Sequence, residues 1–223
     1  MNLKEAAAKS ATTLVEDGQI VGLGTGSTAT FAIQEIARRV KDEALDILGI
    51  PTSIATERLA RSLDIPLTTL EEHPKVDIDI DGADQVDAAL NLIKGGGGAH
   101  TREKVVAKHA AKFVVIVDET KISDTLNIPV PVEVVPRSWE SIALKLDGLG
   151  GKPRLRTSKR GPFITDNDNY IIDCDFGTIT NPESLEKDIN SIEGVIDNGI
   201  FVGLTSEVHI GTANGIKIKT KPE

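Results

Sequence analysis

The sequence is poor in cysteine, in aromatic residues and in long hydrophobic runs. Only one of its 223 residues is cysteine and 3% are aromatic. The lone Cys174 has no disulfide or CxxC partner, which disfavours a structural zinc site and favours a reducing compartment. With few aromatics, the core must consist of Ile, Val, Leu and Ala. No run is long and apolar enough to span a membrane, and the N-terminal segment indicates a helix and not a signal peptide, so we expect a cytoplasmic protein.

The charge balance excludes some classes of partner. The formal net charge is −9 and 39% of residues are hydrophobic. An acidic globular chain is disfavoured as a binder of nucleic acid or of anionic membranes, whereas a small anionic substrate in a local nest of N–H groups is compatible with it. The four histidines lack metal-ligand spacing, so we expect no metal.

The apolar pattern predicts that strands and helices alternate in the first part of the chain. Strands are expected at 19–23, 45–50, 67–70, 76–80 and 113–117, and helices at 3–18, 29–40, 53–63 and 101–111. Short connections between such elements favour right-handed crossovers and a Rossmann-like, doubly wound, mainly parallel sheet in an α/β fold. Ligands of such sheets bind beyond the carboxyl ends of the strands.

A turn rich in glycine and hydroxyl residues, Gly24–Thr28, joins the first expected strand to a helix. Free N–H groups and the positive end of a helix dipole meet at such a turn, which is typical of a phosphate site. The alternative is an ordinary helix cap in which the glycines serve only the turn. The third glycine of G-x-G-x-x-G is missing and no GK[ST] follows, so a dinucleotide site and a P-loop are both disfavoured.

Two carboxylates, Asp81 and Asp84, follow the strand at 76–80. They are placed to accept hydrogen bonds from sugar hydroxyls, or alternatively to cap a helix starting near Gln85. Leu92 and Ile93 fit either the end of that helix or a further short strand. A calcium loop is disfavoured because its twelfth position, which requires Glu, is Ala88.

Lys94 stands directly before four consecutive glycines, Gly95–Gly98. Such glycines are kept where the backbone approaches a ligand closely, and a lysine beside their N–H groups favours stabilisation of an oxyanion. Glu103 lies in the first turn of the next expected helix. By itself it indicates compensation of the helix dipole, but next to this loop it is also a candidate catalytic base. Lys121 follows a strand end and alone indicates a surface lysine.

The pattern changes after residue 128. Strands are expected at 130–135, 152–156, 170–174 and 195–202, and helices at 138–146 and 182–192. This β-α-β-β-α-β order predicts a small ferredoxin-like α+β domain at 129–203, while a hairpin near the C-terminus returns to a first domain of 1–128 and 204–223. The basic cluster at 152–160 is interpreted as a solvated surface, with a subunit contact as the alternative.

Five segments together, GLGTGST, DGAD, IKGGGGAHTREK, VDETK and PVEV, resemble ribose-5-phosphate isomerase of the A type over essentially the whole chain. The resemblance implies that Glu103 accepts the proton and that Asp81, Asp84 and Lys94 hold the sugar, assist ring opening and steady an enediolate. Further substrate contacts that it implies are Thr25, Gly26, Ser27, Thr28, Gly82, Ala83, Gly95, Gly96, Gly97, Lys121 and Lys4. It also implies no cofactor, no metal and a homodimer or homotetramer. Gly98 stands where many members are expected to have alanine, and we expect it to loosen the loop.

The expected activity is interconversion of D-ribose 5-phosphate and D-ribulose 5-phosphate in the non-oxidative pentose phosphate pathway. Three alternatives remain open at this stage. An amino-sugar phosphate isomerase/deaminase would use a similar base and phosphate site, and a CoA-transferase-like enzyme would use Glu103 as a nucleophile. A sugar-phosphate-sensing regulator is the non-enzymatic alternative, although no basic helix-turn-helix segment is present.

Overall fold

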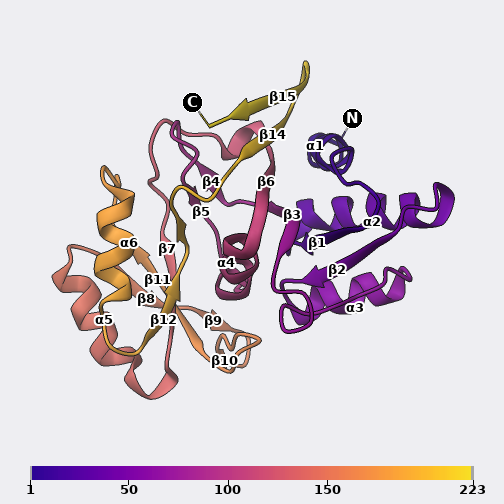
Figure 1. Cartoon of the computed structure of the whole chain (residues 1–223). Coiled ribbons are helices and arrows are strands. Elements are labelled where there is room, and N and C mark those ends of the chain that lie inside the picture. The colour runs from indigo at the N-terminus through magenta and orange to yellow at the C-terminus, as the bar shows by residue number, and fades with distance from the viewer. Residues whose placement is uncertain (1, 222–223) are drawn as a thin grey trace. The chain divides into compact units, whose positions relative to one another are not determined.

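The computed structural model describes residues 2–221 and divides the chain into two compact units (Figure 1). The first unit comprises the residues up to Ala83, Arg102–Ile122, and the residues from Leu204 onward. The second comprises Asp84–Thr101 and Ser123–Gly203. Within residues 2–221, no helix is long and apolar enough to cross a membrane.

The first unit is built on a six-stranded sheet. Its helices are α1 (Leu3–Thr12), α2 (Ser27–Asp42), α3 (Ile54–Ser62) and, from Arg102 onward, α4 (His100–His109). Its strands are β1 (Gln19–Leu23), β2 (Ile47–Pro51), β3 (Val76–Gly82), β6 (Ala110–Asp118), β14 (Glu207–Thr212) and β15 (Gly215–Thr220). The order is β15-β14-β6-β3-β1-β2, with only β15 antiparallel to its neighbour. The Rossmann-like, mainly parallel sheet predicted from the sequence is confirmed, and the C-terminal hairpin adds its last two strands.

The strand order creates a switch point between β1 and β3. β1 pairs with β2 on one side and with β3 on the other, so the chain leaves β1 in one direction and later returns to its opposite side. The turn after β1 and the end of β3 therefore lie at neighbouring carboxyl ends. Open α/β sheets bind their ligands at such a point.

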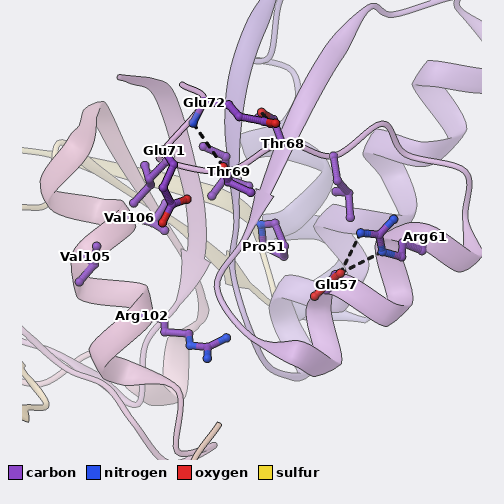
Figure 2. A pocket seen from close by; sticks show the side chains of 13 residues that line it. Pro51, Glu57, Arg61, Thr68, Thr69, Glu71, Glu72, Arg102, Val105 and Val106 are labelled. Carbon is purple, nitrogen blue, oxygen red and sulfur yellow. Dashed lines mark hydrogen bonds and ion pairs between the residues drawn. The ribbon is translucent and has the colours of Figure 1, made fainter. Parts of the chain in front are cut away.

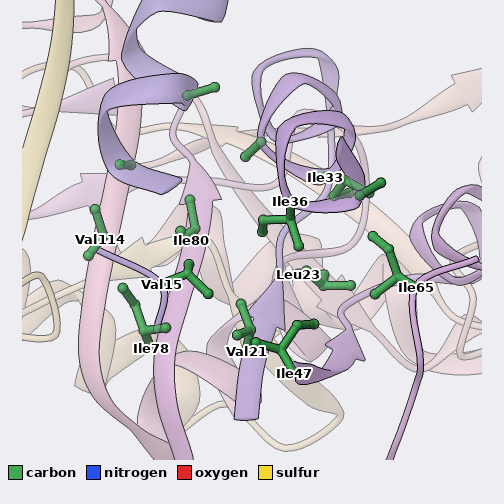
Figure 3. Close-up of a cluster of buried hydrophobic side chains, with 14 of the residues drawn as sticks. Val15, Val21, Leu23, Ile33, Ile36, Ile47, Ile65, Ile78, Ile80 and Val114 are labelled. Atoms are coloured by element: carbon green, nitrogen blue, oxygen red, sulfur yellow. The ribbon is translucent and has the colours of Figure 1, made fainter. Parts of the chain in front are cut away.

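The core of the first unit fills the space between this sheet and the helices α1 and α2. Figure 3 shows the strand residues Val21, Leu23, Ile78 and Ile80 in one buried cluster with Ile36 of α2, and each is at most 2% exposed. Each fully buried aliphatic side chain stabilises the fold by about 1.5–3 kcal/mol. As the sequence predicts, the buried residues of this cluster are all aliphatic, and the aromatic Phe31 packs against it only partly buried.

The second unit contains a four-stranded antiparallel sheet and smaller pairings. Its elements are β4 (Gln85–Val86), β5 (Leu92–Ile93), β7 (Val130–Val134), α5 (Trp139–Gly148), β8 (Lys152–Leu155), β9 (Thr157–Ser158), β10 (Gly161–Pro162), β11 (Tyr170–Asp175), α6 (Pro182–Asn190), β12 (Val195–Asn198) and β13 (Ile200–Phe201). The main sheet has the order β12-β7-β11-β8, which is the ferredoxin-like arrangement expected from the sequence.

Three local expectations differ from the structure. No helix starts near Gln85: β4 and β5 form a hairpin there, and β5 pairs with β13. The expected strand at 67–70 is reduced to one bridge between Gly49 and Leu67. The expected strand at 195–202 is divided at Gly199 between two sheets. Because of the β5–β13 pairing, residues 84–101 belong to the second unit, whereas the sequence assigned them to the first domain.

Candidate active site

The turn after β1 is held by a buried carboxylate at the end of β3. Asp81 is fully buried, and its Oδ1 accepts the N–H of Thr25 at 3.0 Å and the N–H of Gly82 at 2.7 Å. A Cβ atom on Gly24 would lie 2.2 Å from the same oxygen. Glycine is therefore required at this position because the two loops approach so closely. The structure thus brings three expected site residues, Thr25, Asp81 and Gly82, into one hydrogen-bonded group.

The hydroxyl of Thr25 is part of a second network. Its Oγ1 lies 2.8 Å from Oγ1 of Thr52, 2.9 Å from Oγ of Ser53 and 3.1 Å from Oγ1 of Thr56. Thr56 Oγ1 in turn donates to the carbonyl of Gly24 at 2.9 Å. The sequence marks Thr25 as a substrate contact, whereas its hydroxyl fixes the turn onto the start of α3 in this structure.

The N-terminus of α2 presents the features of an anion site. Gly26 precedes the helix with φ of +109° and is exposed, as is Ser27, and the first turn contains no acidic residue. The Nζ atom of Lys4, from α1, donates to Oγ of Ser27 at 3.0 Å. Thr28 is half-buried and faces Gly82. Free N–H groups, a helix dipole and an ammonium group therefore point to the same place.

Lys4 and Lys121 both lie near the carboxylate of Asp118 in the first unit. Asp118 ends β6, and Lys121 closes the 3₁₀ helix η1 (Glu119–Lys121) directly after it. Burial opposes ionisation of Asp118, but hydrogen bonds from the hydroxyl and N–H of Thr120 lower its pKa below the ordinary value. The charges of Lys4 and Lys121 lower the pKa of Asp118 further. Both lysines thus lie on the carboxyl-end side of the sheet with the turn after β1.

Glu103 lies in the first turn of α4 and is 5% exposed. The adjacent Lys104 is fully buried. α4 starts in the second unit and continues in the first, since the boundary falls between Thr101 and Arg102. A buried carboxylate on a helix that is fixed at its start has the restricted mobility that a base requires.

In the second unit, the glycine loop closes onto Asp84. The Oδ2 atom of Asp84 accepts the N–H of Gly96 at 2.7 Å, and a Cβ on Gly96 would lie 2.9 Å from Oδ1. Gly95 has φ of +108° and packs against the ring of His100. Gly97 is exposed with no atom near its Cβ position. Ala83, directly before Asp84, is half-buried and ends the first unit.

The expectation that Gly98 loosens the loop stays a prediction, but the structure gives a further reason for glycine at this position. Its φ is +79°, and a Cβ atom would lie 2.5 Å from Cε1 of Phe163. Its N–H also donates to the carbonyl of Gly95 at 3.0 Å. Glycine at this position therefore permits a tight turn against an aromatic ring.

Lys94 is held deep in the same unit. Its side chain is buried at 2% exposure, and Nζ lies 5.6 Å from the centre of the Phe201 ring, in cation–π range. Its N–H donates to the carbonyl of Gly199 at 2.8 Å, and a Cβ on Gly199 would meet the Lys94 carbonyl at 2.2 Å. The backbone hydrogen bond to Gly199 thus fixes the lysine at the start of the glycine loop.

Arg156 fastens the other side of the glycine loop. Its Nη1 donates to the carbonyl of Gly95 at 2.8 Å and to that of Gly96 at 3.3 Å. Its Nε donates to Asp173 at 2.9 Å, and Nη2 also binds this carboxylate. The interpretation of the basic cluster as a solvated surface is therefore wrong for Arg156, whose side chain is only 15% exposed.

A cavity of about 530 Å³ also opens in the first unit, away from the expected site residues (Figure 2). Arg102 and Val105 of α4 line one side, and Glu57 and Arg61 of α3, which form an ion pair, line the other. The segment 67–72 completes the wall. None of the residues expected from the sequence to bind substrate lines this cavity. Within residues 2–221, no group of three His, Cys, Asp or Glu side chains is arranged to hold a metal ion.

Comparison with known proteins identifies the family. Residues 48–215 match the family model of ribose 5-phosphate isomerase A, also called phosphoriboisomerase A. The ribose-5-phosphate isomerase A of Methanosarcina acetivorans is 52% identical over 98% of this chain and 94% of its own length. This chain belongs to the ribose 5-phosphate isomerase A family. The resemblance that the sequence motifs suggest is thereby confirmed.

Other members of the ribose 5-phosphate isomerase A family also match this chain over nearly its whole length. The protein of Methanothermobacter thermautotrophicus is 48% identical over 98% of this chain and 97% of its own. The structure of the enzyme from Methanocaldococcus jannaschii superposes with a TM-score of 0.95, at 47% identity and 99% coverage of both chains. A D-ribose-5-phosphate isomerase in complex with phospho-erythronic acid gives a TM-score of 0.96 at 42% identity, covering 99% of this chain and 100% of the other.

For this isomerase A family member, the sequence motifs located the loops but missed the residues that fix them. Arg156, which is paired with Asp173, binds the carbonyls of Gly95 and Gly96, and Glu133 on β7 binds Thr101 at the start of α4. The only sequence signal for Glu133 is a charged residue inside an apolar strand, within PVEV. Arg156 has no such signal, because it lies within a cluster of other basic residues.

Proposed function

We propose that this chain interconverts D-ribose 5-phosphate and D-ribulose 5-phosphate through an enediolate, with Glu103 as the general base. The observation that carries the proposal is the match to an isomerase that holds phospho-erythronic acid, with a TM-score of 0.96 over 99% of this chain. That ligand is a phosphorylated sugar acid. Its carboxylate is planar and carries two oxygens, and it therefore resembles the planar enediolate with its oxygens O1 and O2. An enzyme that stabilises such a species binds its analogue tightly.

We assign the phosphate to the turn after β1 and the start of α2. Gly26, Ser27 and Thr28 supply backbone N–H groups and hydroxyls there, and Lys4 lies 3.0 Å from Ser27. Lys121 adds a second positive charge on the same side of the sheet. An anchored phosphate orients the distant carbon atoms, so its binding energy contributes to the reaction of C1 and C2.

We assign the proton transfer to Glu103. Its carboxylate takes the proton from C2 of the open-chain aldose, and the electrons of that C–H bond form the C1–C2 double bond as the C1=O1 double bond opens and O1 becomes the oxyanion. The proton then returns to C1 while the hydroxyl at O2 passes its proton to O1, which leaves a carbonyl at C2 and gives the ketose. Burial of Glu103 at 5% exposure keeps its side chain in few conformations. A positioned base of this kind contributes about 10²–10⁴ to the rate.

We assign the stabilisation of the developing oxyanion to Lys94 and to the N–H groups of Gly95 and Gly97, since the N–H of Gly96 already donates to Asp84. Each well-placed donor of this type contributes about 2.7–4 kcal/mol to the transition state. Asp81 and Asp84 bind sugar hydroxyls and assist ring opening, and Asp81 passes the proton between O1 and O2. Both carboxylates also accept backbone N–H bonds, which orients them before the substrate arrives.

Replacement of Glu103 by glutamine tests this assignment. Glu103→Gln keeps the size of the side chain and removes its basicity, so kcat is expected to fall about 10²–10⁴-fold with little change in KM. Glu57→Gln, on the exposed side of α3, is the matched control and is expected to retain activity. Unchanged turnover in Glu103→Gln contradicts the assignment. Release of ammonia from glucosamine 6-phosphate by the unmodified protein would instead indicate a deaminase.

We also propose that the protein is a cytoplasmic homodimer or homotetramer. β15 forms an edge of the six-stranded sheet, and Ile216 and Ile218 on it are 37% and 53% exposed. Apolar side chains on an unpaired edge favour association. Light scattering after gel filtration tests this, and a monomeric mass at micromolar concentration contradicts it.

A further inference from the structure

Glu133 is a fully buried carboxylate in the middle of a buried strand. All five residues of β7 are buried, and Val130, Val132 and Val134 belong to the core of the second unit. Strand alternation places Glu133 on the opposite side from these valines. A buried charge is unfavourable unless hydrogen bonds compensate it. The hydrogen-bond partners of Glu133 therefore indicate which segments this carboxylate holds together.

Four side chains donate hydrogen bonds to this carboxylate. Oε1 accepts from Thr165 Oγ1 at 2.8 Å, from Asn169 Nδ2 at 2.9 Å and from Asn167 Nδ2 at 3.1 Å. Oε2 accepts from Oγ1 of Thr101. Burial alone would raise the pKa of Glu133, but these four bonds outweigh it and lower the pKa below the ordinary value. The group is therefore ionised at neutral pH and acts only as an acceptor.

The two carboxylate oxygens of Glu133 bind different segments of the chain. The three donors to Oε1 come from one turn, which Thr165 closes by a backbone bond from its N–H to Asn169 and by accepting the N–H of Asp168. The Oε1 side is thus anchored inside the second unit. Oε2 has a different donor, Thr101, which belongs to the first turn of α4.

Thr101 is separated from Glu103 by a single residue of α4. At 3.6 residues per turn, side chains two positions apart point about 200° away from each other around the helix. Glu133 therefore binds one side of the first turn of α4, while the side chain of Glu103 projects from a different side of the same turn. The first turn of a helix has N–H groups without partners inside the helix and is the part that frays most easily.

We propose that Glu133 is a positioning residue which, through Thr101, fixes the first turn of α4 and so the direction of the Glu103 carboxylate. The inference rests on the proposed role of Glu103 as base. It assigns to the ferredoxin-like unit a part in catalysis through a residue outside the expected substrate contacts.

Two isosteric substitutions separate this role from a purely structural one. Thr101→Val and Thr165→Val each remove one hydroxyl donor to the same buried carboxylate. Thr165 also accepts the backbone N–H groups of Asn167 and Asn169, so its replacement is expected to cost at least as much stability. Only Thr101 lies in α4. Thr101→Ser retains the hydroxyl and serves as the rescue variant.

The measurement is kcat and KM for ribose 5-phosphate, with thermal unfolding of each variant followed by circular dichroism. Thr101→Val is expected to lower kcat about 10–100-fold while KM stays nearly constant, because a misplaced catalytic group costs up to about 10² in rate. Thr165→Val is expected to retain kcat despite a lower unfolding temperature, and Thr101→Ser to restore it.

Equal losses of kcat in Thr101→Val and Thr165→Val would overturn the inference, as would an unchanged kcat in folded Thr101→Val. The Glu103→Gln variant, measured in parallel, separates the two proposals. Full turnover in Glu103→Gln refutes the base itself. Lost turnover in Glu103→Gln with normal turnover in Thr101→Val refutes only the positioning role.

Discussion

Replacement of Arg156 by methionine tests how far the glycine loop depends on a residue outside the sequence motifs. Methionine keeps much of the apolar stem and removes the guanidinium. The lost interactions are the bonds to the carbonyls of Gly95 and Gly96 and the two-pronged pairing with Asp173. The substitution also removes the cation–π contact of the guanidinium, whose carbon lies 5.7 Å from the centre of the Phe163 ring.

The size of the effect follows from what each partner loses. Asp173 is 32% exposed on its side chain, so water replaces the guanidinium there at little cost. Gly95 is buried, and a charged hydrogen bond to such a carbonyl is worth about 1.5–3 kcal/mol. Because the N–H groups of Gly95 and Gly97 are assigned to the oxyanion, a comparable loss in the transition state lowers kcat about 10–100-fold.

The assay compares kcat of Arg156→Met with that of Arg154→Met. Arg154 lies in the adjacent strand β8 and is exposed, so its loss is expected to leave kcat within about twofold of the wild-type value. Circular dichroism verifies that both variants fold. If folded Arg156→Met shows the same kcat as Arg154→Met, the reasoning that this arginine orders the loop for catalysis is refuted.

Three further predictions concern stability and reactivity. Gly98→Ala forces a positive φ and a contact with Phe163, so we expect it to lose about 2–4 kcal/mol in urea unfolding, whereas Gly97→Ala, in open space, stays within about 0.5 kcal/mol of wild type. The folded-state pKa of Glu133 lies below its ordinary value of 4.5, so its stabilisation is present above that pH and is lost as the pH falls below it. Glu133→Gln should therefore be less stable at pH 7 but show a flatter acid dependence in unfolding experiments; equal slopes would contradict this. Burial raises the pKa of the Cys174 thiol to about 12, so a thiol reagent at neutral pH should react only in denaturant, and rapid labelling of the native protein would disagree.

The alternation of strands and helices was predictable because it rests on local patterns. β1 and β6 contain short apolar runs, aliphatic residues alternate with aspartates along β3, and the Gly/Ser/Thr turn before α2 has a local signature of its own. β4 and β5 have two residues each, and besides pairing with each other β5 pairs with β13, more than 100 positions along the chain. No periodicity extends over two residues, so the region after Asp84 looked like a helix start.

In the candidate site too, some residues could be predicted from local sequence motifs, whereas others depend on contacts between distant parts of the chain. The glycines and the acidic residues near them carry motif signals, and their roles in catalysis stay predictions. The residues that hold them, Arg156 and Glu133, act across the fold on segments at least 32 positions away. Neither their partners nor their burial can be inferred from neighbours in the sequence. Gly98 is a further example, since an added Cβ atom at this position would contact Phe163, which is distant in the sequence.

The most direct test of the central claim is proton NMR of the purified, EDTA-treated protein with ribose 5-phosphate in D₂O. A base that exchanges its proton with solvent during the enediolate step must deliver deuterium to C1. The account predicts ribulose 5-phosphate that carries deuterium at C1, and loss of this product in Glu103→Gln. Ribulose 5-phosphate without deuterium at C1 after many turnovers, or no ribulose 5-phosphate at all, would contradict it.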